Sequence, residues 1–221
     1  MRFLHCVHAE FLLVLPRLTR TRLGVALLTL GVTLVWFSAH GLDPLSATLQ
    51  VAALGAIIGA ADMVGRLDDR RALSTALTHP TTSFALATGR WLAIVMPAAA
   101  LMLACSAAIG WHGGAAAAGL ATAAAVAGCA LATVLLLGNT AALALFLFVA
   151  VVGTIAPERL VALAQPGVLR LTAASALELG PALWHYRGIA TGDIDAVLHA
   201  VAWAGLGILL ASALIARTHA H

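Results

Sequence analysis

Long apolar runs alternate with short polar stretches along most of the chain. Six of these runs approach the roughly 20 residues that an α-helix needs to cross the hydrocarbon core of a bilayer. Charged residues lie mainly in the connections between the runs. The pattern therefore predicts an all-α polytopic integral membrane protein with six transmembrane helices, at residues 23–39, 47–64, 91–110, 115–137, 141–155 and 196–216.

The first 22 residues carry a short apolar stretch followed by Pro16, Arg17, Arg20 and Arg22. A secretory signal would place small residues at a cleavage site after its apolar region, and this stretch has none. We therefore expect residues 1–22 to form an amphipathic interfacial helix, with its apolar side among the lipid headgroups and its arginines in water.

Residues 156–194 break the pattern before the last run. They contain three prolines, mixed charge and short apolar pieces, and Arg170 interrupts any continuous span. Irregular backbone at membrane depth survives only where other helices bury it. This extracytoplasmic segment is therefore expected to form either short interfacial helices or one re-entrant hairpin.

The composition agrees with a membrane protein and excludes several chemistries. Of the 221 residues, 62% are hydrophobic and 10% charged, whereas soluble domains carry about 25% charged residues. All 12 basic residues are arginine, so the lysine of a phosphate-binding P-loop is missing. We expect no catalytic residues, no enzyme activity and no cofactor in this chain; any ATP-Mg would be bound by a partner.

Cysteine and histidine spacings point away from a metal site. Cys6, Cys105 and Cys129 form no CxxC pair, and the nine histidines form no closed ligand set. The pI near 9.2 could suggest nucleic acid, but the arginines follow the predicted topology instead of forming one basic patch. We therefore expect membrane lipid, and no metal or nucleic acid, as a partner.

The arginines also predict the orientation of the chain. With the N-terminus inside, nine of the 12 arginines are cytoplasmic and three lie in residues 156–194. Cytoplasmic loops carry an excess of Arg and Lys, so both termini are expected in the cytoplasm, with the bacterial inner membrane as the location.

The most polar internal stretch is residues 65–90, between the second and third runs. Residues 67–78 are predicted to form a helix of about three turns. His79 precedes Pro80 and so disfavours a helical conformation. Residues 81–83 then offer N-caps for a new helix that runs through Arg90 into the third span.

This stretch, DDRRALSTALTHPTTSFALATGR, resembles the permeases of ABC-2 type exporters. The six spans, the N-terminal amphipathic helix and the long segment before the last span agree with that layout. The resemblance implies a coupling helix seated in a separate ATP-binding cassette subunit, export as the direction, and a second permease forming a homodimer or heterodimer. The partner-coupling residues that it implies are Asp68, Asp69, Arg70, Arg71, Leu73, Leu77, His79 and Pro80.

Small residues indicate where helices pack closely. Gly55 and Gly59 form a GxxxG motif on the second span, where packing within the chain is favoured over dimerisation. The outer half of residues 115–137 is almost entirely small, so this span should pack against neighbours. Asp62 at the inner end of the second span is expected to pair with Arg66, one helical turn later.

Asp195, His199 and Trp203 share one face of the sixth span. They could line a substrate path, or they could be a packed histidine with an interfacial tryptophan. The pairs Trp111-His112 and Trp184-His185 give slight support to a haem-exporter-like permease of cytochrome c maturation, although aromatic belts explain them equally well. The alternative from another class is a non-transporting membrane assembly or scaffold subunit, for which residues 65–90 would be a docking loop.

Overall fold

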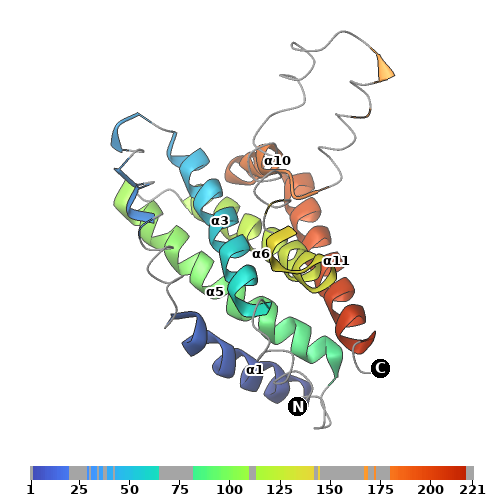
Figure 1. The fold of residues 1–221 in the computed structure, drawn as a ribbon. Helices are drawn as coiled ribbons and strands as arrows, with labels where there is room; N and C mark the ends of the chain where they lie inside the picture. Colours follow the sequence, from blue (N-terminus) through green and yellow to red (C-terminus); the bar gives the residue numbers. More distant parts are fainter. Residues whose placement is uncertain are drawn as a thin grey trace.

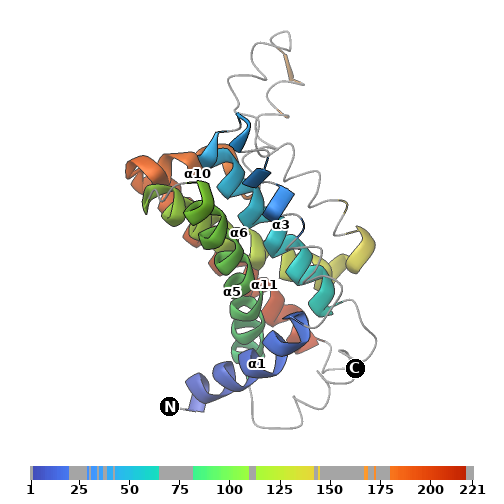
Figure 2. The same cartoon turned by 90° about the vertical axis from the view of Figure 1, so that its left-hand side faces the viewer.

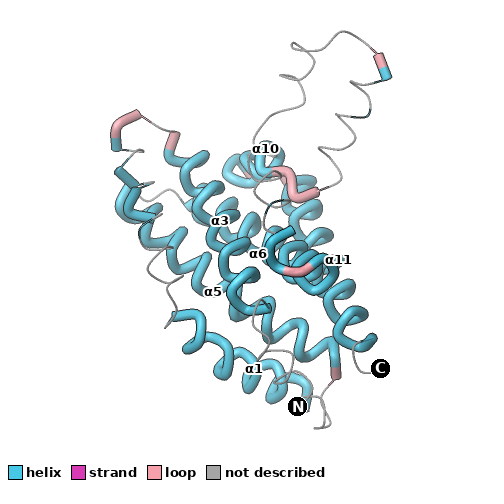
Figure 3. Tube along the Cα trace, in the orientation of Figure 1, coloured by secondary structure: helices cyan, strands magenta, loops and turns pink. Residues whose placement is uncertain are grey.

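The computed structural model describes residues 2–19, 29, 31–33, 35–36, 39–41, 43–64, 82–109, 113–141, 144, 167–168, 172 and 180–217. Within this part of the chain the regular elements are all helical, and no strand occurs (Figure 3). They are α1 (Arg2–Thr19), α3 (Pro44–Val64), α5 (Ser83–Ile109), α6 (Gly113–Leu137), α10 (Leu183–Tyr186), the 3-10 helix η1 (Arg187–Thr191) and α11 (Ile194–Arg217). The all-α prediction is therefore confirmed for the described residues.

Four of these helices are long and apolar enough to cross a membrane: α3, α5, α6 and α11. They cover the predicted second, third, fourth and sixth spans. The predicted spans at residues 23–39 and 141–155 lie mostly outside the described residues. The four helices indicate a membrane protein, and the number of six spans stays a prediction.

The long helices form one bundle, with α1 lying across one end of it beside the beginning of α5 (Figures 1 and 2). The short elements α10 and η1 lie at the opposite end, where α3 and α11 begin. The marked N- and C-termini both lie at the end that carries α1 (Figure 1). The predicted interfacial helix thus lies outside the bundle of long helices.

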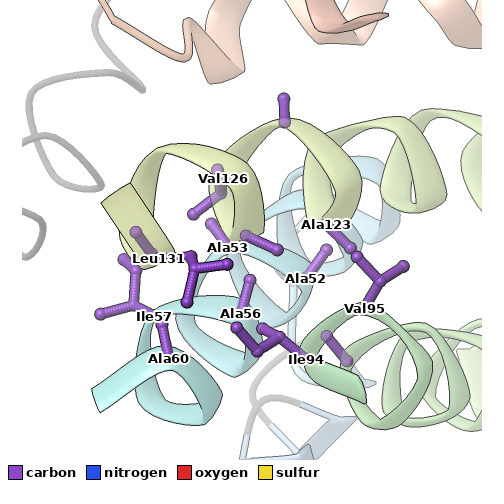
Figure 4. Packing of buried hydrophobic residues seen from close by; sticks show 14 of the residues in the cluster. Ala52, Ala53, Ala56, Ile57, Ala60, Ile94, Val95, Ala123, Val126 and Leu131 are labelled. Atoms are coloured by element: carbon purple, nitrogen blue, oxygen red, sulfur yellow. The ribbon is translucent and has the colours of Figure 1, made fainter. Parts of the chain in front are cut away.

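Small side chains allow the bundle helices to approach closely. Figure 4 shows the contact of α3 with α5 and α6, where alanines of α3 meet larger side chains from both neighbours. The residues labelled there are Ala52, Ala53, Ala56, Ile57 and Ala60 of α3, Ile94 and Val95 of α5, and Ala123, Val126 and Leu131 of α6. α6 also packs along α11, in agreement with its small-residue composition.

The outward face of α11 is apolar. Leu198, Val201 and Leu209 are each at least 60% exposed. A water-soluble surface rarely presents a continuous stripe of this kind, whereas lipid tails cover it at no cost. This stripe supports the assignment of α11 as a membrane span.

Candidate functional site

The partner-coupling residues predicted from the sequence, Asp68, Asp69, Arg70, Arg71, Leu73, Leu77, His79 and Pro80, all lie outside the described residues. Their coupling role stays a prediction. The structure does describe the two helices that residues 65–82 connect. α3 ends at Val64 and α5 begins at Ser83, and the two pack against each other in the bundle.

α5 begins at a side-chain cap, as the hydroxyl residues at 81–83 predict. The Ala85 N–H donates to Thr82 Oγ1 at 3.2 Å, and the Leu86 N–H donates to the Thr82 carbonyl at 3.1 Å. These bonds satisfy donors that a helix start leaves unpaired. From there α5 runs for 27 residues through Arg90 to Ile109, with Pro97 in its interior.

Helix α1 rests on the first turns of α5. The rings of Phe3 and Phe84 stack with their centroids 5.8 Å apart. At Gly89 the two backbones come so close that an added Cβ would lie 3.0 Å from the Val7 carbonyl oxygen and 2.8 Å from Glu10 Cβ. A larger residue at position 89 would force the two helices to shift apart, so this glycine lets α1 lie directly against the part of α5 nearest residues 65–82.

A buried ion pair joins the same two helices. Arg90 Nε donates to Glu10 Oε1 at 2.8 Å, and the two side chains are only 5% and 9% exposed. Arg90 Nη1 is buried and has no hydrogen-bond partner among the residues that the structure describes. Because a buried charge is costly unless it is paired, removing either partner of such a pair costs roughly 3–5 kcal/mol.

This pair is absent from the sequence interpretation, which used Arg90 only for the topology signal and as the basic residue that opens the third span in the resemblance. The sequence feature that could have indicated a buried ion pair is the position of Glu10 on α1. Glu10 falls on the same helix face as Phe3 and Val7, because residues three, four and seven apart lie above one another. A carboxylate on the apolar face of a helix requires a partner, although the sequence does not say which arginine supplies it.

At the opposite end of the bundle, the predicted pair His199 and Trp203 joins a buried tyrosine. Trp203 Nε1 donates to His199 Nε2 at 3.1 Å, and His199 Nδ1 lies 3.3 Å from the Tyr186 hydroxyl. Since Nε2 accepts, a neutral imidazole carries its proton on Nδ1 and donates it to Tyr186. Burial raises the pKa of the Tyr186 hydroxyl, so the phenol stays neutral.

Besides Tyr186, His199 has a second neighbour from α10. The His185 ring meets the His199 ring edge-on, with centroids 5.4 Å apart, and Trp184 lies beside His185 at 5.2 Å. Trp184 Nε1 is buried and finds no hydrogen-bond partner within the described part of the chain. Asp195 is exposed at the beginning of α11. The helix-face pattern therefore predicted part of the cluster and missed the residues that α10 contributes.

An exposed ion pair ties η1 to the beginning of α3. Arg187 Nη2 lies 2.6 Å from Asp43 Oδ2, and Arg187 Nη1 donates to Ser46 Oγ at 2.7 Å. Partial burial raises the pKa of Asp43, but hydrogen bonds from Ser46 and the Leu45 N–H and the Arg187 charge outweigh it. The pKa of Asp43 consequently lies below its ordinary value.

The other predicted positions are described in part. Gly55 and Gly59 are buried, and an added Cβ at Gly59 would lie 3.3 Å from Ile94 Cγ2 of α5, so this glycine faces a helix of the same chain. Asp62 is half-buried, and its expected partner Arg66 lies outside the described residues. Among the residues that the structure describes, no three His, Cys, Asp or Glu side chains form a group that could hold a metal.

Comparison of the chain with family models, curated proteins and solved structures gives no match. The class that the fold defines is a helical membrane protein, and its function has to be argued from the arrangement at the two ends of the bundle.

Proposed function

We propose that this chain is the transmembrane permease subunit of an ATP-driven exporter of the ABC-2 type. A separate ATP-binding subunit contacts residues 65–82 and drives substrate movement through the bundle. The chain works with a second permease, a copy of itself or a related chain. The end that carries α1 and both termini faces the cytoplasm.

The observation that carries this proposal is the continuity of α5. The helix begins at the Thr82 cap, directly after the charged segment, and runs for 27 residues with Pro97 in its interior. At 1.5 Å per residue it is about 40 Å long, enough to reach from the cytoplasmic surface across the hydrocarbon core. A displacement of the segment would therefore act first on residues 83–96, the part of α5 before Pro97, and through it on the helices packed against α5.

The packing of α3 against α5 also supports a coupling role for residues 65–82. Residues 65–82 enter from α3 and leave into α5, and these helices are in contact through Gly59 and Ile94. A partner that tilts the segment therefore changes the position of two adjacent helices together. The contribution of this chain is motion, because the sequence lacks the lysine that binding of nucleotide phosphates in a P-loop requires.

The haem-exporter-like permease is a second candidate, and the cluster opposite α1 favours it. Haem iron takes a histidine as an axial ligand, and flat rings pack against its faces. Trp203 and Tyr186 occupy both nitrogens of His199. His185, beside Trp184, would be the residue to supply the ligand. Titration of the purified protein with haemin, followed by the Soret band, separates this candidate: a shifted band that His185→Ala abolishes supports it.

The coupling proposal is tested by exchanging the charges of the segment. The variant Asp68→Arg, Asp69→Arg, Arg70→Asp, Arg71→Asp keeps the net charge and so preserves the topology signal. Arg217→Gln, at the end of α11, is the control at the same end of the bundle. We expect the exchange to leave insertion intact and to abolish transport driven by ATP, whereas the control retains it. Normal transport by the exchanged variant would refute the coupling assignment.

A further inference from the structure

Three described contacts seat α1 on α5, and they all fall between Ser83 and Arg90. They are the stacking of Phe3 on Phe84, the backbone approach at Gly89 and the ion pair of Glu10 with Arg90. α1 also contacts α3. The interfacial helix therefore lies at the ends of both helices that residues 65–82 connect.

The ion pair is an unusual way to hold two apolar helices together. Both side chains are at least nine-tenths buried, and one guanidinium nitrogen of Arg90 has no hydrogen-bond partner among the described residues. Replacing a buried ion pair by apolar residues of similar volume is often neutral or stabilising. Stability alone therefore does not account for Glu10 and Arg90. What a directional charged bond adds to apolar packing is a fixed position of one helix along the other.

We propose that the Glu10–Arg90 pair is a positioning tie that makes α1 move together with α5. This inference rests on the proposed function, in which residues 65–82 receive the movement of an ATP-binding partner. When α5 moves, α1 then moves with it along the membrane surface, and α5 does not slide past α1. Glu10 and Arg90 act through the position of α1 and touch neither substrate nor nucleotide.

The first test separates position from stability. In Glu10→Met, Arg90→Met the pair is replaced by apolar side chains of similar length, so we expect the chain to fold and insert normally. Without the directional bond α1 can slide along α5. We expect substrate transported per ATP hydrolysed to fall by about tenfold, within the range typical of coupling between sites. Wild-type coupling in this variant would overturn the proposal, because the pair would then be only one way of filling the contact.

The second test restores the tie by another chemistry. The Cβ atoms at positions 10 and 89 would lie 2.8 Å apart, and a disulfide needs about 3.5–4.5 Å, so a shift of roughly 1 Å admits one. Glu10→Cys, Gly89→Cys is made in a chain whose Cys6, Cys105 and Cys129 are replaced by alanine. We expect low coupling in the reduced form and recovery on oxidation, with the cysteine-free parent, oxidised in parallel, as control. An oxidised variant that stays uncoupled would refute the tie.

Measurements on the wild-type complex, purified with its companions, separate the proposed exporter function from the positioning role of the Glu10–Arg90 pair. ATP hydrolysis and transport by that complex support the proposed function, and the two variants then decide whether the pair is a tie. A wild-type preparation without ATP-linked activity rejects the proposed function, and the tie as stated falls with it. Loss of coupling in the methionine variant together with rescue by oxidation supports the tie.

Discussion

Among the glycines that the structure describes, Gly207 lies closest to the backbone of a neighbouring helix, and this allows a sharp prediction. A Cβ added there would lie 2.2 Å from the carbonyl carbon of Gly128 and 2.6 Å from the Cys129 nitrogen, both backbone atoms of α6. Ordinary contact begins near 3.4 Å, so Gly207→Ala must separate α11 from α6 by roughly 1 Å. Overpacking typically costs about 1–3 kcal/mol where side chains can move to relieve it. The atoms met here belong to the backbone and cannot rotate away, so the cost should lie at the upper end of that range. We expect the free energy of unfolding to fall by about 3 kcal/mol.

The chain supplies a matched control two residues away on the same helix. A Cβ added at Gly205 would have no heavy atom of the described residues within 4 Å. Gly205→Ala should therefore be neutral, or stabilising by up to about 1 kcal/mol through helix propensity. Unfolding in mixed micelles with a rising fraction of SDS, followed by circular dichroism, compares the two variants. Equal stability of Gly207→Ala and Gly205→Ala would refute the close crossing of α6 and α11.

Three further predictions concern the end of the bundle that carries α10 and the orientation of the chain. Asp43→Asn should lower the melting temperature slightly at pH 7. The folded-state pKa of Asp43 lies below its unfolded value, so the ionised carboxylate stabilises the fold above about pH 4, and this stabilisation disappears as pH falls through the folded-state pKa. The melting temperatures of the wild type and of Asp43→Asn should therefore converge between pH 7 and pH 3. Trp203→Phe removes the indole donor to His199 and should cost about 0.5–1.5 kcal/mol in the same SDS assay, and an unchanged free energy would argue against that bond. A single cysteine at position 195 should react with an impermeant maleimide added outside intact cells, and one at position 217 only after permeabilisation; the reverse result would invert the orientation.

The sequence predicted the long helices well because their signal is compositional. An apolar run near 20 residues has few alternatives to a spanning helix, and α3, α6 and α11 each begin within three residues of the predicted position. α5 begins at Ser83, eight residues before the predicted span, and there the capping residues located the start of the helix while hydropathy located the span. Local chemistry and apolar composition therefore mark different boundaries of the same helix.

The site contacts were harder to predict because they join residues far apart in the chain. His199 and Trp203 are one turn apart on one helix, so the helical repeat placed them together. Glu10 and Arg90 come from helices whose relative position no local pattern determines. The same holds for Tyr186 and His185 beside His199, which depend on how α10 folds back onto α11. Contacts between residues of different helices depend on how those helices pack, and the periodicity of the sequence alone does not predict that packing.

The central claim is that this chain works with an ATP-binding partner, and purification from native membranes tests it most directly. The chain is extracted in mild detergent and its companions are identified by mass spectrometry, first for the wild type and then for the variant with exchanged charges at 68–71. We predict a stoichiometric soluble protein with a Walker A motif in the first preparation. Membrane companions without any ATP-binding chain would contradict the account and make the scaffold subunit the better interpretation.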